Sequence, residues 1–284
     1  MWILGDNRRT LIRLQGRQEV QRFSLGTSDA SLLGAPDGRA IVVSSQYSNG
    51  QTTYTFTPYG LQGVQSARSF SAQDLGYSVE EGRIDAAGNY WTIQNVSGNS
   101  TTLVRANLTT GVVEKVAADQ PYSLSDPLLS SPDGRTLMVA SSGTTYRIDT
   151  QSGVITSAPR SSDLPTPTVL DNAGNWYGRT YQGVVRVPAQ GTPQTYTAVT
   201  YGTVLGVDRA DSNSLWVADA PYLRKLDLTT GTVKSTAVYS SYVGNTYTSS
   251  VGQSLGGDGG AWLFGSSTTY SGTPSTTYFA SLVK

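Results

Sequence analysis

The side chains that carry most acid–base and nucleophilic catalysis are missing from this chain of 284 residues, which contains no His and no Cys. Their absence excludes Ser-His-Asp and Cys-His triads, imidazole general bases and thiolate–zinc sites. Any chemistry must therefore come from carboxylates, from hydroxyls or from a hard metal ion held by oxygen ligands.

Carboxylates are the first candidates for such chemistry. Glu is rare in the chain, and Glu80 and Glu81 are adjacent. With Asp126 and Asp208 they form a set of oxygen ligands that suits calcium. One hypothesis is therefore a metal-dependent hydrolase or lyase with these acidic residues at a central channel. The other interpretation is that the chain needs no cofactor and that its Asp residues shape turns by accepting hydrogen bonds from their own backbone.

Tyrosine is the second candidate, with 17 Tyr against 5 Phe. Long connections rich in Ser, Thr, Asn and Gly are expected at Ser45–Thr53, Ser71–Gly76, Ala118–Pro127, Pro159–Pro167, Tyr239–Thr248 and Ser266–Ser275. Within or beside them lie Tyr47, Tyr122, Tyr222, Tyr239, Tyr242, Tyr247 and Tyr270. Tyr offers rigid contact area with a hydroxyl group, and small polar neighbours offer hydrogen bonds, so these residues predict a binding face. The alternative is that the connections are merely well solvated.

These candidates must be positioned by a repeat of about 40 to 50 residues, a period typical of propeller blades. A bulky apolar residue opens a short strand in each unit, at Trp2, Ile41, Trp91, Leu137, Tyr177, Trp216 and Trp262. Five of these residues follow a turn glycine by three positions, at Gly38, Gly88, Gly134, Gly174 and Gly259. Recurrence at one position of the repeat predicts that the apolar residues pack between neighbouring blades.

The repeat predicts an all-β fold, a seven-bladed β-propeller of four-stranded antiparallel blades in a single domain over residues 1–284. One seam is expected to be incomplete, with the first blade lacking its inner strand and the last blade lacking its outer strand. Propellers commonly pair such open edges with the other end of the chain. We therefore expect about 20 to 30 further residues before Met1, or else an irregular seam.

The runs Asp85–Tyr90 and Asp171–Trp176 both read Asp-x-x-Gly-Asn-aromatic. With the Leu-Thr-Thr-Gly type of turn at Leu108–Gly111, they resemble the NHL and streptogramin-lyase-like propellers. The resemblance implies the fold and not the function, because it consists of structural repeat residues. Streptogramin lyases use a catalytic His, which this chain lacks, so their activity is not implied.

Arginine is concentrated at the start of the chain, at Arg8, Arg9, Arg13, Arg17 and Arg22, against only Asp6 and Glu19 in the same segment. One interpretation is a basic edge for an anionic partner or a neighbouring domain. The other is a solvated outer strand whose charge discourages edge-to-edge association. The formal net charge of the whole chain is zero, which argues against a nucleic-acid partner.

The leading functional hypothesis is a non-enzymatic binding or scaffold propeller that recognises a protein or a polysaccharide through its Tyr-bearing loops. It is expected to be a monomer or part of a larger assembly. No apolar stretch approaches the roughly 18 residues of a membrane-spanning helix, so membrane insertion is not expected. The absence of Cys and the low charge content of 14% favour an extracytoplasmic location, with no export signal in this chain.

Overall fold

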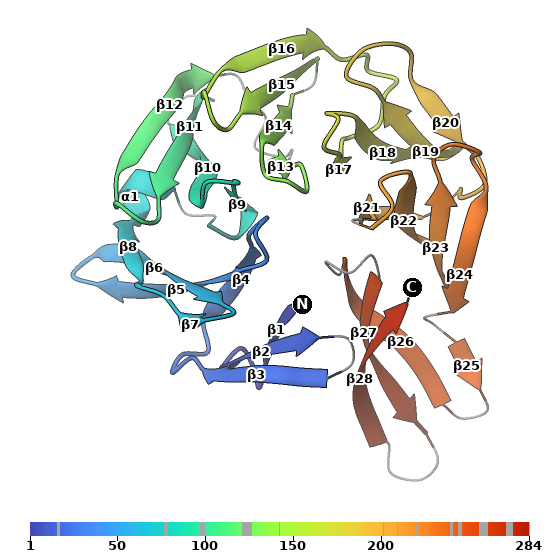
Figure 1. The fold of residues 1–284 in the computed structure, drawn as a ribbon, viewed down its shortest axis with the longest axis horizontal. Helices are drawn as coiled ribbons and strands as arrows, with labels where there is room; N and C mark the ends of the chain where they lie inside the picture. The colour runs from blue at the N-terminus through green and yellow to red at the C-terminus, as the bar shows by residue number, and fades with distance from the viewer. Residues whose placement is uncertain are drawn as a thin grey trace. The chain divides into compact units, whose positions relative to one another are not determined.

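The computed structural model describes the chain except residues 16–17, 77–78, 97–99, 121–126, 142, 201, 209, 220, 239–240, 244–245, 256–260, 271–274 and 284. Only the backbone is described for residues 95–96, 100, 118–120, 238, 241–243, 246–255, 261–267 and 275–283. The chain divides into two compact units, Met1–Ser162 and Asp163–Lys284, and each is described by itself (Figure 1). The prediction of one domain over the whole chain stays a prediction.

The first unit begins with two sheets. The first has three strands, β1 (Trp2–Gly5), β2 (Thr10–Gln15) and β3 (Gln18–Ser24). The second contains β4 (Ala30–Gly34), β5 (Ala40–Ser48), β6 (Gln51–Gly60), β7 (Gly63–Val64) and β8 (Arg68–Ser71). Both β7 and β8 pair with β6, at its two ends, so together they form one interrupted outer strand.

Two further antiparallel sheets complete the first unit. One contains β9 (Arg83–Ile84), β10 (Asn89–Val96), β11 (Ser100–Asn107) and β12 (Val113–Gln120). The other contains β13 (Leu129–Ser130), β14 (Thr136–Ala140), β15 (Thr144–Asp149) and β16 (Ile155–Pro159). The short helix α1 (Ala72–Leu75) and the 3₁₀ turn η1 (Val79–Glu81) connect β8 to β9. Within the described residues no helix has the length and apolarity that a membrane crossing requires.

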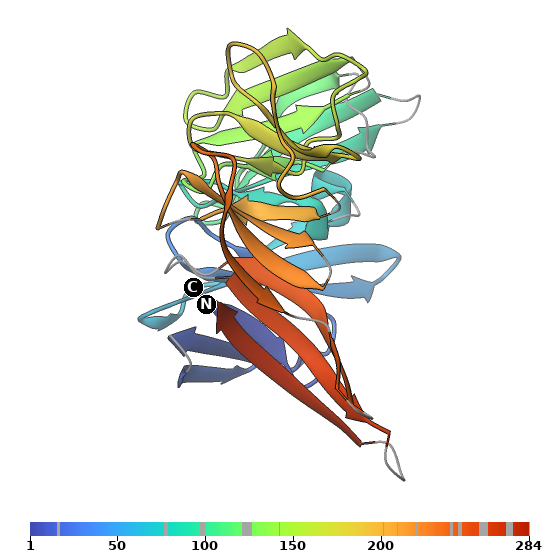
Figure 2. The ribbon, with the colours of Figure 1, turned by 90° about the vertical axis from the view of Figure 1, so that its right-hand side faces the viewer.

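The second unit contains three four-stranded sheets, drawn from yellow-green to red in Figures 1 and 2. The first has β17 (Val169–Leu170), β18 (Trp176–Thr180), β19 (Gly183–Val187) and β20 (Gln194–Tyr196). The second has β21 (Thr203–Val207), β22 (Ser214–Asp219), β23 (Tyr222–Asp227) and β24 (Val233–Val238). The third has β25 (Ser241–Val243), β26 (Thr246–Leu255), β27 (Ala261–Thr269) and β28 (Ser275–Val283).

The number of blades differs from the sequence-based expectation. Each complete blade has strand positions A to D in chain order, and the structure has six such four-stranded blades, so the prediction of seven is wrong. Trp2 does open a strand, but its sheet has three strands within the described residues and is not a complete blade. The expectation that the last blade lacks a strand is also wrong. There β26 to β28 match the expected strands, and β25 adds a fourth before them.

The predicted role of the repeated apolar residues is confirmed where side chains are described. Consecutive residues of a B strand point to opposite faces, and both faces are buried between sheets. On β10, Tyr90 packs into a cluster with Ile41 and Phe56 of the preceding sheet. Its neighbour Trp91 packs into a cluster with Leu137 of the following sheet. Burial on both sides explains why these strands read as near-continuous apolar runs.

Leu137 is offset by one residue from the position that it was expected to share with Trp91. The Asp85 N–H donates to the Asn89 carbonyl, which closes a turn four residues later. The equivalent bond on β14 runs from Ser131 to Thr136 and closes a turn one residue longer. Met138 is therefore the equivalent of Trp91, and like Trp91 it is fully buried.

A cation faces the aromatic residue of the B strand in three sheets, a pairing that the sequence analysis did not identify. Arg13 lies directly opposite Trp2 and Arg105 opposite Trp91 in the strand register. The guanidinium carbons lie 5.8 Å and 5.3 Å from the two ring centroids. Lys225 is paired in the same way with Trp216, at 5.6 Å. Such contacts add roughly 0.5–1 kcal/mol each where they are partly exposed.

Three turns between A and B strands are built around the buried carboxylates of Asp85, Asp171 and Asp208, which confirms the turn-forming role expected of Asp. Asp85 accepts hydrogen bonds from the backbone N–H groups of Ala87 and Asn89 at 2.9 and 2.8 Å. It also accepts from Asn89 Nδ2 at 2.9 Å and from Trp91 Nε1 at 2.7 Å. One side chain thus closes the turn and fixes the indole that packs against the next blade.

We expect Asp85→Ala to destabilise the protein by about 3 kcal/mol, because buried donors of Asn89 and Trp91 lose their acceptor. The matched control is Asp37→Ala in the equivalent turn of the second sheet, where the carboxylate is 46% exposed. That change is expected to cost less than about 1 kcal/mol. Urea denaturation of both variants measures the difference, and equal losses would show that the buried network is not decisive.

Candidate functional site

Exposed tyrosine marks one position of the repeat. Among the described residues four tyrosines are exposed, namely Tyr47, Tyr181, Tyr222 and Tyr270, with exposed fractions of 75%, 81%, 36% and 55%. Three of them, Tyr47, Tyr181 and Tyr222, lie in or beside the turn that joins strand B to strand C of a sheet. Tyr270 follows β27, the third strand of its sheet, and lies in the connection to β28. The second unit presents three of them, on three successive sheets.

In the second unit the backbone around the B–C turns is tightly specified. Gly183 follows Tyr181 at φ +151°, and a Cβ there would lie 2.1 Å from the Tyr196 carbonyl oxygen, so only Gly fits. At the next turn the Arg224 guanidinium lies 5.0 Å from the Tyr222 ring centroid. Arg224 is itself held by an ion pair of 3.1 Å with Asp219. Rigid strands therefore present these rings at defined places.

Tyr47 in the first unit lies near the tip of the β5–β6 hairpin. Asn49 and Gly50 form its turn with φ of +52° and +79°. Positive φ at both central residues is the type I′ geometry for which Asn-Gly is favoured. Beyond Ser44, β5 pairs only with β6, so the hairpin extends past the inner strand of its sheet (Figure 2). The segment Ser45–Thr53, expected to be a loop, is thus mostly strand.

The other predicted tyrosines divide as follows. Tyr122 and Tyr239 lie outside the described residues. Tyr242 and Tyr247 are direct backbone partners in the β25–β26 hairpin, and only their backbone is described. Tyr181 was missed because its connection is short. Its place in the Thr-Tyr-Gln-Gly turn between two strands is the signal that could have found it.

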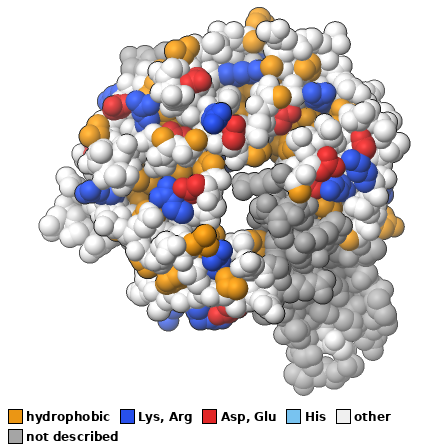
Figure 3. Space-filling view, viewed as in Figure 1, with side chains coloured by type: hydrophobic (Ala, Val, Ile, Leu, Met, Phe, Trp, Pro, Cys, Tyr) orange, Lys and Arg blue, Asp and Glu red, His pale blue; other side chains and the backbone are white. Residues whose placement is uncertain are grey.

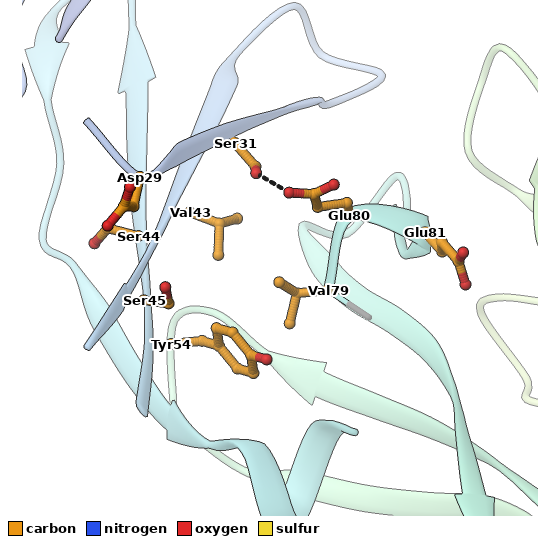
Figure 4. Close-up of a pocket in the computed structure, with 9 residues that line it drawn as sticks. All are labelled: Asp29, Ser31, Val43, Ser44, Ser45, Tyr54, Val79, Glu80 and Glu81. Carbon is orange, nitrogen blue, oxygen red and sulfur yellow. Dashed lines mark hydrogen bonds between the residues drawn. The ribbon is translucent and has the colours of Figure 1, made fainter. Parts of the chain in front are cut away.

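A polar cavity of about 320 Å³ lies in the first unit. Its lining consists of Asp29, Ser31, Val43, Ser44, Ser45, Tyr54, Val79, Glu80 and Glu81 (Figure 4). Ser31 Oγ donates to Glu80 Oε1 at 2.6 Å, which orients that carboxylate, whereas the Glu81 side chain points away from it. The lining contains no Lys or Arg, so the cavity offers carboxylates and hydroxyls only.

Buried packing beneath η1 positions these glutamates. The Tyr90 hydroxyl donates to the Val79 carbonyl at 2.9 Å. A Cβ on Gly82 would lie 2.2 Å from the Tyr90 ring, so this close approach requires Gly. Burial raises the pKa of Tyr90 well above its usual value, so the phenol stays a neutral donor. Arg83 donates to the carbonyls of Glu81 and Gly82, and burial lowers its pKa.

The four acidic residues proposed as metal ligands have different surroundings. Glu80 and Glu81 line the cavity, Asp126 lies outside the described residues, and Asp208 belongs to the second unit. In the part of the chain that the structure describes, no group of three or more Asp, Glu, His or Cys is close enough to hold a metal ion. Whether these residues bind a metal stays a prediction.

Asp208 occupies the same turn position as Asp85 but has a different partner. Its carboxylate is fully buried, and Oδ2 lies 2.5 Å from Lys225 Nζ. This contact is an ion pair without hydrogen-bond geometry, since Oδ2 has no hydrogen-bond partner within the described residues. The other oxygen accepts from the Ala210 N–H at 2.9 Å. The arrangement gives Asp208 a structural role, neutralising a largely buried lysine.

Charged side chains are sparse on the face drawn in Figure 3, where they occur singly or in small groups among uncharged ones. This matches the charge content of 14%. The described residues form no extended region of one sign on this face, so a ligand there would be recognised by local contacts.

Comparisons with known proteins show the fold alone. No family model and no curated protein matches the sequence. Among solved structures, TolB from Acinetobacter baumannii matches with a TM-score of 0.46 and 14% identity, over 89% of this chain and 63% of TolB. Hsv2 from Kluyvelomyces marxianus matches with a TM-score of 0.54 and 11% identity, over 84% of this chain and 75% of Hsv2. Oligogalacturonate lyase from Vibrio parahaemolyticus matches with a TM-score of 0.55 and 10% identity, over 89% and 79%.

These likenesses show that the chain has a β-propeller fold, and they do not distinguish the NHL and streptogramin-lyase-like family from other propellers. The chain spans less than two thirds of TolB. By their names the neighbours include an enzyme as well as proteins of other kinds, so the fold leaves the function open.

We expect Lys225→Met to destabilise the protein by about 3–5 kcal/mol, because it leaves the buried Asp208 carboxylate without a counter-charge. The double variant Asp208→Asn with Lys225→Met should recover much of that loss. Lys234→Met is the matched control, since this lysine is 36% exposed and pairs with Asp211 and Asp227 at the surface. Its loss is expected to cost about 1 kcal/mol or less.

Urea denaturation of the three variants measures these differences. A measurement of the Tm with calcium could contradict the structural role of Asp208. If calcium raises the Tm of the wild type but not that of Asp208→Asn, Asp208 is a metal ligand and not a structural counter-charge.

Proposed function

We propose that this β-propeller is a non-enzymatic binding module that recognises a protein partner through the tyrosines of its B–C turns. The observation that carries the proposal is the placement of the exposed Tyr181 and Tyr222 at the same B–C turn on two successive sheets of the second unit. Every exposed tyrosine among the described residues lies in or beside a connection between two strands.

Exposed tyrosine at a rigid turn is suited to binding. A Tyr side chain contributes a large apolar area and one hydroxyl, and only two torsions have to be fixed when it binds. The strands on either side already fix the backbone, so association costs little additional ordering. Solvated connections would need no aromatic side chain at this position.

A protein surface fits this arrangement better than a polysaccharide. The four exposed tyrosines lie on separate turns, and none of them lines the cavity at Ser31 and Glu80. Rings on separate projecting turns suit a broad surface contact in which a few aromatic anchors supply most of the binding energy. The low charge content and the lack of Cys support the separate proposal that the protein acts outside the cytoplasm.

The hydrolase or lyase alternative has less structural support. Asp208, one of its four acidic candidates, is fully buried and paired with Lys225. Glu80 and Glu81 line a cavity with an exposed rim but are oriented in different directions (Figure 4). These residues would need rearrangement before they could act on one ligand.

We expect the double variant Tyr181→Ala with Tyr222→Ala to bind the partner about 10- to 100-fold more weakly, as expected for the loss of two aromatic anchors. A photo-crosslinking residue at position 181 captures the partner from an extract of the source organism. Calorimetric titration of the purified partner then gives the affinity of the wild type and the variant. The Tm should change little, because both rings are exposed.

Val154→Ala is the control for this experiment, because Val154 is 57% exposed but lies in a C–D turn. It should leave the affinity unchanged. Wild-type affinity in the double tyrosine variant would contradict the proposal, as would an equal loss in Val154→Ala.

A further inference from the structure

The β1–β2 turn has an unusual backbone. Asp6, Asn7 and Arg8 follow one another with φ of +49°, +53° and +66°. Only Gly adopts this left-handed region without penalty, and other residues visit it singly. The Arg9 N–H donates to the Asp6 carbonyl at 3.2 Å, so Asn7 and Arg8 are the central residues of the turn. Asn tolerates this conformation well, whereas Arg8 is strained there.

The strained turn carries two arginines without a counter-charge. Arg8 and Arg9 are exposed, and their guanidinium groups form no ion pair with any residue that the structure describes. The nearby carboxylates are already engaged, because Arg22 pairs with Asp6 at 3.4 Å and with Glu19 at 2.7 Å. Thr10 also donates to Asp6.

The remaining described arginine of this sheet has its own partners. Arg13 lies over the Trp2 ring and donates to Gln21 at 3.3 Å. Arg8 and Arg9 are therefore the described arginines of this sheet whose guanidinium groups have no side-chain partner among the described residues.

The turn lies at the same end of its unit as the Tyr47 hairpin. The Leu25 N–H donates to the Arg9 carbonyl at 2.8 Å, so the connection from β3 to β4 begins beside the turn. That connection leads to Ala30, which pairs with Ser44 at the base of the projecting part of β5. The arginines and the Tyr47 hairpin are thus joined by one short connection.

We propose that the β1–β2 turn is a recognition element for carboxylates of a partner polypeptide, with Arg8 and Arg9 as the contacting residues. Backbone strain without a structural benefit is commonly retained where it presents a functional side chain. Arg guanidinium groups bind carboxylates through paired, charge-assisted hydrogen bonds. The proposal does not rest on the tyrosines of the second unit.

An acidic polypeptide fits the turn better than a nucleic acid does. Nucleic-acid binding needs a basic stripe that follows many phosphates, whereas here two arginines stand at one tip of a chain with zero net charge. A polypeptide can place a few carboxylates at the turn without needing further basic contacts along its length.

The experiment measures binding of a fluorescent oligo-glutamate peptide by anisotropy at low salt, with the whole chain. The double variant Arg8→Gly with Arg9→Gln should bind about tenfold more weakly than the wild type. Arg135→Gln is the matched control, because Arg135 is an exposed arginine in an A–B turn of the same unit. It removes one positive charge and should retain wild-type binding. The tyrosine double variant should also bind the peptide as the wild type does.

A stability measurement distinguishes strain from ordinary surface charge. Arg8→Gly alone should raise the Tm by about 2 °C, because Gly adopts the left-handed conformation without penalty, while it weakens peptide binding. Unchanged peptide binding in the Arg8, Arg9 double variant would overturn the proposal, and so would an equal loss in Arg135→Gln. Tighter binding of single-stranded DNA or polygalacturonate than of oligo-glutamate would overturn the choice of a polypeptide.

Discussion

Packing between the faces of neighbouring sheets is the constraint on which the rest of this structure depends. A B strand buries both of its faces, as β10 does with Tyr90 on one side and Trp91 on the other. Most of the large apolar side chains are committed to this packing, and three of the five tryptophans are among the most buried residues. The B strands therefore offer little surface for recognition, and the turns are the natural place for exposed contact residues.

The turns divide the work between stability and recognition. The A–B turns hold buried carboxylates that organise the start of the B strand, and their partners vary from sheet to sheet. In the third sheet Asp85 accepts from the Trp91 indole, whereas in the sixth Lys225 takes the Asp208 carboxylate and the Trp216 Nε1 has no partner among the described residues. The same geometry is thus maintained by a hydrogen bond in one case and by an ion pair in the other. The B–C turns, in contrast, carry exposed tyrosine or arginine.

The sequence predicted the local structure well but predicted the wrong number of blades, for identifiable reasons. Alternation, turn glycines and Asp-x-x-Gly runs predicted the strands, the turn role of Asp85 and the burial of Trp91, since each depends on residues near in sequence. The number of complete blades depends on which segments pair with one another, and the sequence did not predict that β25 pairs with β26. The longer turn before β14 displaced the assignment from Met138 to Leu137. The cavity at Glu80 and Ser31 could not be predicted, because it joins residues 49 positions apart.

The first sheet shows how a strained turn can persist in such a fold. The pairs Gly5–Thr10 and Leu4–Leu11 hold the two sides of the β1–β2 turn together. Leu11 is fully buried against the next sheet, in a cluster with Ala40 and Tyr59. The register of the hairpin is thus determined by burial, and the turn must span the fixed gap whatever its residues prefer. Packing that tolerates an unfavourable backbone leaves the identity of the turn residues open to selection for binding. Glycine at position 8 would relieve the strain but would remove the guanidinium group, so retention of Arg8 agrees with the recognition role proposed for this turn.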